Sequence, residues 1–293
     1  MEERKNYATY SDGKVKRYLY DHGLPFSKKL DQNLDDLRKR IKSKKASLMI
    51  IDGGIGEGKT TLAVHCAEYF TKTPLKFKRQ LGMGGVDFQE KLQISIDSGF
   101  KVAIYDEAGD FDKRGSITKF NMSLNRVFDT YRTYGILVII ILPNFNVLDN
   151  SLFDKQIPRL LIHCYGRNDY YGNYKVYSLY RMFYLKKRMK DLTVKPHAYG
   201  MVDPNFVGHF LDLIPERSEE LDKYSTTGKK EIITNNILKA KGLISYMEIS
   251  KQVNKSIPWI KRKVKDLSIK PAHVYKRRNF YNVSIVEMLR EEM

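Results

Sequence analysis

Residues 50–61 read Ile-Ile-Asp-Gly-Gly-Ile-Gly-Glu-Gly-Lys-Thr-Thr, and this stretch decides the fold. Gly53, four further residues and then Gly58-Lys59-Thr60 match the pattern of a phosphate-binding loop, or Walker A motif. The apolar run 47–51 before the loop predicts a buried strand, and the helical spacing of apolar side chains over 61–70 predicts a helix after it. A strand before and a helix after are the context that such a loop requires, so the sequence predicts an α/β nucleotide-binding core.

The residue types of this loop suit a nucleotide phosphate. Glycines let backbone N–H groups approach an anion closely, and the start of a helix adds unpaired N–H groups and a positive dipole end. Lys59 can reach the β- and γ-phosphates, and the Thr60 hydroxyl can ligate Mg²⁺. We therefore predict ATP and Mg²⁺ as cofactors. The expected nucleotide contacts are Gly53, Gly54, Ile55, Gly56, Glu57, Gly58, Lys59, Thr60 and Thr61.

A second motif follows at residues 101–107, Lys-Val-Ala-Ile-Tyr-Asp-Glu, where an apolar strand ends in two acids. This is the Walker B pattern. We expect Asp106 to hold Mg²⁺, directly or through water, opposite Thr60. We expect Glu107 to polarise the attacking water, which favours hydrolysis over storage of the nucleotide.

The most apolar stretch of the chain, 136–142, predicts a strand at the centre of a parallel sheet. Asn144 follows just beyond its end, where ligands bind in open α/β sheets. Asn144 can therefore contact the γ-phosphate or place the water. The alternative is an Asn that forms a turn after Pro143.

The flanking segments complete the predicted domain organisation. Helical spacing over 27–44 predicts an amphipathic helix within an N-terminal extension, 1–45, that precedes the ATPase core, 46–190. Strand-like runs at 159–165 and 174–184 predict an antiparallel hairpin that extends the parallel sheet. Prolines and glycines interrupt 191–228, which predicts an irregular linker that packs on the core.

Composition points to the partner and the compartment. The 293-residue chain has a net charge of +18, which indicates a polyanionic partner, most readily nucleic acid. The alternatives are a solvated basic surface or a contact with acidic lipid. Cys66 and Cys164 lie far apart and predict neither a disulfide framework nor a metal cluster. The longest apolar run is too short to span a bilayer, and the first residues lack the apolar segment of a signal peptide. We expect a cytoplasmic protein, or one inside a virus-infected cell.

The C-terminal residues, 229–293, read as a separate module. They contain 15 Lys and Arg but only six Asp and Glu, half of the net charge. Helical patterns at 231–241, 245–253 and 256–267, followed by a hairpin, predict a winged helix-turn-helix domain. In the third helix Ile260, Val264 and Leu267 form the expected buried stripe. The alternative use of such a domain is protein contact, but its charge favours DNA. The expected DNA contacts are Lys261, Arg262, Lys263, Lys265, Lys276, Arg277 and Arg278.

The order of these motifs resembles the FtsK–HerA superfamily, which covers DNA-pumping and packaging ATPases and Zot-like phage proteins. The resemblance spans residues 46–185 and rests on GGIGEGKT, VAIYDE, the helix end YRTYG, the strand ILVIIILPN and the hairpin that begins at Arg159. This chain has Asn144 where the family usually places Gln. By position Arg132 resembles the family's arginine that reaches the γ-phosphate of a neighbouring subunit, with Arg126 as the second candidate and a solvated helix-end cation as the alternative. The resemblance implies a homo-oligomer, of which a hexameric ring is one form.

The sequence thus predicts a RecA-like parallel α/β core with a C-terminal winged helix, which couples ATP hydrolysis to translocation, packaging or remodelling of double-stranded DNA. One alternative is a replication initiator or helicase loader of the AAA+ class. Against it, residues 157–188 read as strands where that class needs a helical lid. Another alternative is a nucleotide-switched DNA-binding regulator, against which Glu107 argues.

Overall fold

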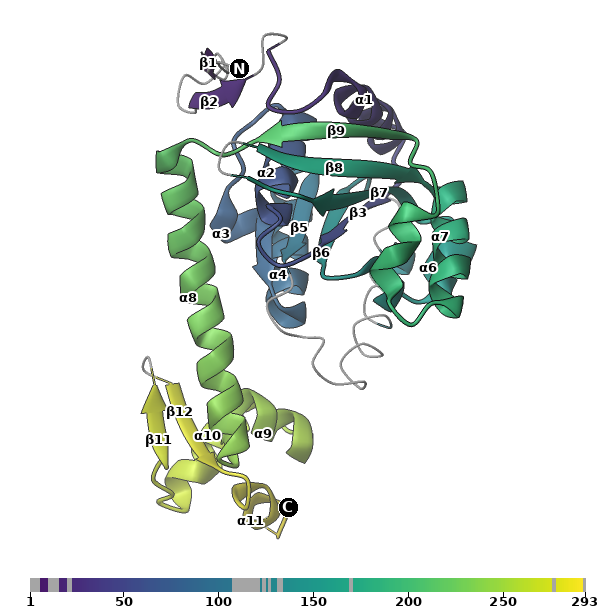
Figure 1. Cartoon of the computed structure of the whole chain (residues 1–293). Helices are drawn as coiled ribbons and strands as arrows, with labels where there is room; N and C mark the ends of the chain where they lie inside the picture. Colours follow the sequence, from purple (N-terminus) through teal and green to yellow (C-terminus); the bar gives the residue numbers. More distant parts are fainter. Residues whose placement is uncertain are drawn as a thin grey trace. The chain divides into compact units, whose positions relative to one another are not determined.

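The chain divides into two units, Met1–Thr226 and Thr227–Met293, each of which is described by itself (Figure 1). The structure is a computed structural model. It describes residues 6–9, 16–19, 23–106, 122, 125, 128–130, 134–168, 171–275 and 278–291.

The described residues of the N-terminal unit form a seven-stranded sheet in the order β4-β5-β6-β3-β7-β8-β9. Its strands are β3 (Ser47–Gly53), β4 (Leu81–Met83), β5 (Val102–Asp106), β6 (Leu137–Leu142), β7 (Pro158–Tyr165), β8 (Tyr171–Ser178) and β9 (Phe206–Leu211). The strands from β4 to β7 pair in parallel, whereas β8 and β9 are antiparallel to their neighbours. Every residue of β3 and β6 is buried, as expected of strands covered on both faces. The predicted α/β class with a mainly parallel sheet is confirmed.

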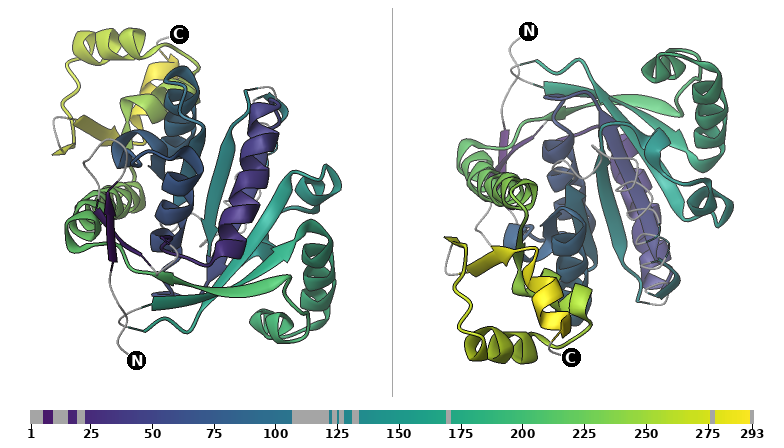
Figure 2. Two further views of the ribbon diagram at one scale, coloured as in Figure 1. Left: turned by 90° about the horizontal axis from the view of Figure 1, so that it is seen from above. Right: turned by 90° about the horizontal axis from the view of Figure 1, so that it is seen from below.

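Helices cover both faces of this sheet (Figure 2). On one face, side chains of α4, α6 and α7 pack against Leu48 and Ile50 of β3 and against Val138 and Ile140 of β6. On the other face, α1 and α2 contact each other and β3. The bounds are α1 (Lys28–Lys42), α2 (Lys59–Thr71), α3 (Phe77–Gln80), α4 (Gly85–Asp97), η1 (Phe145–Val147), α6 (Asn150–Asp154), α7 (Leu179–Asp191) and η2 (Lys195–Gly200). A separate hairpin pairs β1 (Asn6–Thr9) with β2 (Lys16–Leu19).

The prediction of a strand over 174–184 was wrong in its second half. The strand ends at Ser178, and α7 begins at the next residue. Alternating tyrosines suggest a strand there, but the side chains that the core buries, Met182, Leu185 and Met189, recur at helical spacing. The burial of these side chains determines the structure, and the basic residues 186–190 consequently lie on a helix.

Residues 191–228 are not an irregular linker. Within them lie η2, β9 and the start of α8 (Pro215–Ala240), so the sheet continues past the predicted end of the core at residue 190. Position 208, inside β9, has room only for glycine, because a Cβ there would lie 2.5 Å from the Tyr174 hydroxyl oxygen. Gly228, which suggests a boundary in the sequence, lies inside α8.

The C-terminal unit folds around its own small core. After α8 it contains β10 (Leu243–Ser245), α9 (Tyr246–Val253), α10 (Ile257–Asp266), β11 (His273–Tyr275), β12 (Arg278–Asn282) and α11 (Ile285–Glu291). Its described strands form an antiparallel sheet in the order β10-β12-β11. The core includes Ile260 and Val264, but the expected third member of that stripe, Leu267, is 36% exposed, because it caps the end of α10.

None of the helices in the described part of the chain has the length and apolar character that crossing a membrane requires.

Candidate functional site

The candidate site is the turn between β3 and α2, whose backbone conformation depends on glycine. Gly53, Gly56 and Gly58 all have positive φ angles, of 143°, 83° and 75°. A Cβ on Gly53 would lie 2.3 Å from the carbonyl oxygen of Cys164, so no larger residue fits there. Ile55 at the tip is fully exposed. The loop is thus an open turn that leads directly into the N-terminus of α2.

Lys59, the first residue of α2, folds back over this turn. Its Nζ donates to the carbonyl oxygens of Gly53, at 2.8 Å, and Gly54, at 2.5 Å. The ammonium group is therefore held above the loop, where the dipole of α2 also favours an anion. A phosphate at this position can take over these hydrogen bonds.

Thr60 and Asp106 meet beside the loop, although they are 46 residues apart in sequence. The Thr60 hydroxyl donates to Asp106 Oδ2 at 3.0 Å. One strand, β6, lies between β3 and β5, and Asp106 pairs in register with Ile141 at the end of that strand. We expected Thr60 and Asp106 to lie opposite each other, and parallel strands bring them together because their carboxyl ends share one edge of the sheet.

The Thr60–Asp106 pair suits a hard cation such as Mg²⁺, because both residues offer oxygen. Among the described residues no group of three or more His, Cys, Asp or Glu side chains forms a metal site. A cation here would take its remaining ligands from phosphate oxygens and water, which is how Mg²⁺ is usually held with a nucleotide.

Asn144 lies at the same edge, just beyond β6. Its side-chain oxygen accepts from the backbone N–H of Asn146 at 2.9 Å and caps η1. The amide oxygen of Asn144 therefore has the role of a turn-forming Asn, which was the alternative to phosphate contact. The amide nitrogen is the group that can donate to a phosphate oxygen.

A buried polar network that the sequence motifs did not predict surrounds Asp52, the residue before Gly53. The Asp52 side chain is 1% exposed and accepts three hydrogen bonds. The donors are the backbone N–H of Phe145 at 2.9 Å, the His163 ring at 2.9 Å and the Tyr199 hydroxyl. The rings of His163 and Tyr199 stack with their centroids 3.5 Å apart. This network joins β3, η1, β7 and η2 directly below the loop.

The pKa values of neighbouring groups follow from their burial. Burial first, and then the charge of Asp52, hold the pKa of Tyr199 well above its ordinary value, so its hydroxyl keeps the proton that it donates. Burial likewise raises the pKa of the Cys164 thiol well above its ordinary value. Cys164 is therefore a packing residue against Gly53 and not a nucleophile.

Arg167, in the β7–β8 turn, also contacts the loop and links it to Asp212. The backbone N–H of Arg167 donates to Glu57 Oε2 at 2.9 Å, and its guanidinium pairs with Asp212 at 2.5 Å. A Cβ on Gly58 would lie 2.9 Å from the ring of Phe210 and 3.3 Å from Arg167 Cδ. The β7–β8 turn and β9 therefore form one wall of the site, which the sequence did not predict because residues 191–228 read as irregular.

Three residues predicted for the nucleotide site lie outside the described residues: Glu107, the expected base, and the two finger candidates, Arg132 and Arg126. Their roles stay predictions from the sequence.

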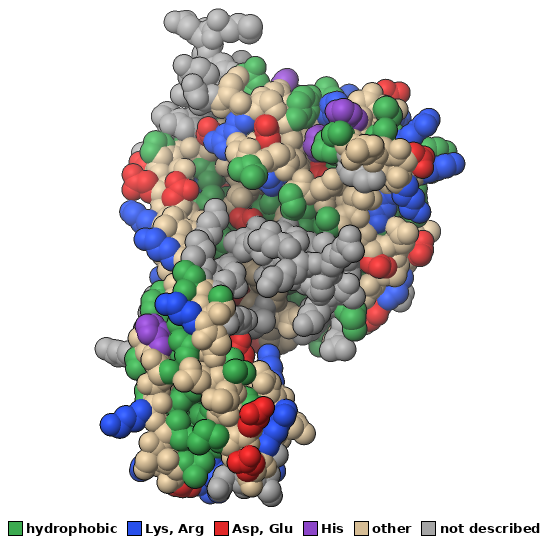
Figure 3. Space-filling model, turned by 60° about the horizontal axis from the view of Figure 1, so that its bottom comes forward, with side chains coloured by type: hydrophobic (Ala, Val, Ile, Leu, Met, Phe, Trp, Pro, Cys, Tyr) green, Lys and Arg blue, Asp and Glu red, His purple; other side chains and the backbone are tan. Residues whose placement is uncertain are grey.

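Of the seven predicted DNA contacts, five lie among the described residues and two lie outside them. In α10, Lys261, Arg262 and Lys265 are exposed and Lys263 is half-buried, while Ile260 and Val264 face the core. Arg278 is exposed at the start of β12. Lys276 and Arg277 lie outside the described residues. Figure 3 shows Lys and Arg side chains at the surface of both units on the face that it draws.

Comparisons with known proteins add little to this geometry. No protein-family model matches the chain, and no curated protein matches it. Among solved structures, the chain is similar to the crystal structure of flagellar accessory protein FlaH from Methanocaldococcus jannaschii. The match has 16% sequence identity, covers 48% of this chain and 83% of that chain, and has a TM-score of 0.23. A likeness at that TM-score carries no argument about function.

Proposed function

We propose that the chain binds ATP with Mg²⁺ at the turn between β3 and α2 and hydrolyses it. The observation that carries this proposal is the 3.0 Å hydrogen bond between Thr60 and Asp106, next to a glycine turn over which Lys59 is folded. A glycine turn, an ammonium group above it and a hydroxyl–carboxylate pair beside it are the parts that phosphoryl transfer needs.

In this proposal each residue has a separate task. The backbone N–H groups of the turn and the N-terminus of α2 bind the phosphates, and Lys59 moves from the loop carbonyls to the β- and γ-phosphate oxygens. Mg²⁺, when bound by Thr60 and Asp106, supplies charge neutralisation at these oxygens. Glu107 orients the attacking water, and the amide nitrogen of Asn144 donates to the γ-phosphate.

Asp106→Asn tests the cation site. The change keeps the size of the side chain but removes a charge that Mg²⁺ needs, so we expect the ATPase rate at fixed Mg²⁺ to fall by about 10²-fold. Titration of Mg²⁺ against the rate should give a higher half-saturating concentration than in the wild type. Asp97→Asn, which changes an exposed acid at the C-terminal end of α4 in the same unit, is the control. An Asp106→Asn variant with the wild-type Mg²⁺ dependence would contradict the assignment.

We further propose that the C-terminal unit is a winged helix that binds double-stranded DNA. Its support is the order of elements from α9 to β12 and the cations on the outer side of α10, together with an excess of nine positive charges over 229–293. From the motif order and this DNA-binding unit together, we propose that the whole chain is a DNA-translocating or DNA-packaging ATPase of the FtsK–HerA type. A ring would let Arg132 complete the site of a neighbouring subunit.

Lys261→Ala/Lys265→Ala tests the DNA surface. We expect duplex affinity to fall and the slope of log K against log salt to become shallower by about 1.8, because each lost phosphate contact removes roughly 0.9. Fluorescence anisotropy with a labelled duplex at several salt concentrations measures this slope. The matched control, Lys241→Ala/Lys251→Ala, removes the same charge from the unit but not from α10, and should keep the wild-type slope. Equal slopes for both double variants would contradict the role of α10.

A further inference from the structure

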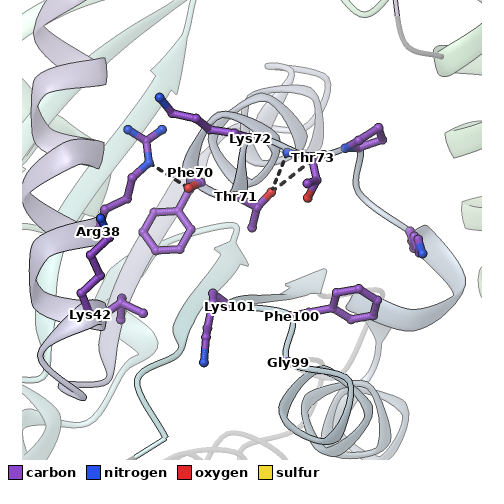
Figure 4. Close-up of a pocket in the computed structure, with 12 residues that line it drawn as sticks. Arg38, Lys42, Phe70, Thr71, Lys72, Thr73, Gly99, Phe100 and Lys101 are labelled. Carbon is purple, nitrogen blue, oxygen red and sulfur yellow. Dashed lines mark hydrogen bonds between the residues drawn. The ribbon is translucent and has the colours of Figure 1, made fainter. Parts of the chain in front are cut away.

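A cavity of about 960 Å³ lies in the N-terminal unit, at the end of α2 away from the candidate site (Figure 4). The two places are the two ends of one helix of 13 residues, roughly 20 Å apart. The cavity is formed by α1, the end of α2, the α2–α3 connection and the turn before β5. Its lining residues are Arg38, Ile41, Lys42, Phe70, Thr71, Lys72, Thr73, Pro74, Lys76, Gly99, Phe100 and Lys101.

The charge of this cavity is one-sided. Five of its lining residues are Lys or Arg, and none is Asp or Glu. Lys42, Lys72, Lys76 and Lys101 are exposed, and none of the four forms an ion pair with a described acidic residue. An accumulation of lysines without acidic partners repels itself unless an anion enters.

Arg38 has a different task from these lysines, because it binds the C-terminal end of α2. Its guanidinium donates to the backbone oxygen of Phe70 at 2.8 Å and to that of Tyr69, and it pairs with Asp35. Two of the last four backbone carbonyl groups of α2, those of Tyr69 and Phe70, thereby have a donor. The four lysines remain the groups available to a ligand.

The cavity also offers flat apolar surface. Phe70, on the α2 side, is buried at 4% exposed, so the half-buried Phe100 on the turn before β5 is the ring that a ligand can reach (Figure 4). Lys76 Nζ is 5.4 Å from the centroid of the Phe100 ring. Cations beside an aromatic ring suit a ligand that combines phosphate with a planar base, because the base can stack while the lysines hold the phosphate.

We propose that this cavity binds a nucleotide, either free or as a unit of a single nucleic-acid strand. Its volume falls within the roughly 300–1,000 Å³ of typical ligand pockets. The site is separate from the glycine turn that we propose for ATP, and its occupancy does not require hydrolysis there. In this proposal phosphate binds near both ends of α2, since this helix begins at the glycine turn and ends at the cavity.

Two probes distinguish the sources, each measured on the full chain. A fluorescein-labelled single-stranded oligo(dT) reports on a strand, and a fluorescently labelled ADP, tested in a Lys59→Ala background, reports on free nucleotide. The cavity variants are Lys72→Ala/Lys101→Ala and Phe100→Leu. The matched control, Lys29→Ala/Lys78→Ala, removes two exposed lysines of the same unit that do not line the cavity. Thermal melting of each variant checks that it folds.

A strand in the cavity predicts that both cavity variants weaken oligo(dT) binding about tenfold while the control does not. The double variant should also lower the salt slope by about 1.4, from roughly 0.7 for each phosphate on a single strand. Photocrosslinking with bromodeoxyuridine in the oligonucleotide should label the peptides that contain Phe70 or Phe100, which separates this site from the C-terminal unit. A free nucleotide predicts the same loss for labelled ADP only.

The proposal is overturned if neither probe distinguishes the cavity variants from the control, or if crosslinks map outside the cavity and ADP binding is unchanged. An acidic peptide as the true ligand would give this negative result. These readings are independent of the ATPase rate, so an inactive wild-type chain would contradict the proposed hydrolysis and leave this test intact.

Discussion

Lys59→Ala is expected to lower kcat/KM for ATP hydrolysis by about 10²- to 10³-fold, which is the usual effect of removing one preorganised group that stabilises the transition state. Lys59 Nζ lies 2.8 Å from the Gly53 oxygen and 2.5 Å from the Gly54 oxygen, so it is already placed above the turn where the phosphates would bind. Removal of this charge weakens both the binding of the phosphates and the stabilisation of charge that develops on them.

Measurement of ATP binding beside turnover separates these two effects. Lys59→Ala should weaken both, whereas Glu107→Gln should retain ATP binding and lose turnover, because a base acts on water and not on the nucleotide. Lys29→Ala, an exposed lysine on α1, is the control and should match the wild type. Wild-type turnover in Lys59→Ala would contradict the assignment of the site, and wild-type turnover in Glu107→Gln would contradict the assignment of the base.

Asp52→Ala is expected to lower the free energy of unfolding of the N-terminal unit by about 3 kcal/mol or more. The change leaves three donors without an acceptor: the Phe145 N–H, the His163 ring and the Tyr199 hydroxyl. Each buried group that loses its partner costs about 1–3 kcal/mol. For a unit of this size such a loss corresponds to a fall in Tm of about 6–12 °C, which thermal unfolding followed by circular dichroism measures.

Tyr199→Phe is the matched comparison, because it removes one donor and leaves Asp52 with two others. We expect a loss of about 1 kcal/mol. If Asp52→Ala melts within about 2 °C of the wild type, the three hydrogen bonds to Asp52 do not stabilise the N-terminal unit as we expect.

The site motifs could be predicted from the sequence because each is local. The glycine turn, Lys59 and Thr60 are contiguous, and Asp106 ends an apolar strand. Their meeting at 3.0 Å follows from a general rule, that parallel strands present their carboxyl ends at one edge. The α/β class follows from the same apolar runs, which the structure buries as β3, β5 and β6.

The Asp52 network could not be predicted in the same way, since its partners are distant in sequence. His163 and Tyr199 lie 111 and 147 residues from Asp52. One signal was present: an acid at the end of a fully apolar strand must find donors if that strand is buried. The sequence alone did not say which donors.

The errors in secondary structure have a common cause. Residues 179–184 contain tyrosines that suit a strand, and residues 206–211 contain a glycine that interrupts one, so local preference pointed the wrong way in both. Packing decided both cases: Met182, Leu185 and Met189 bury as a helix, and Gly208 lets β9 lie against Tyr174.

The most direct test of the central claim is the Mg²⁺-dependent rate of ATP hydrolysis by the full chain, with and without duplex DNA, with particle size measured on the same sample. Our account predicts Mg²⁺-dependent turnover that duplex DNA accelerates, in particles larger than a dimer. Turnover that is absent, or that neither Mg²⁺ nor duplex DNA changes, would contradict it.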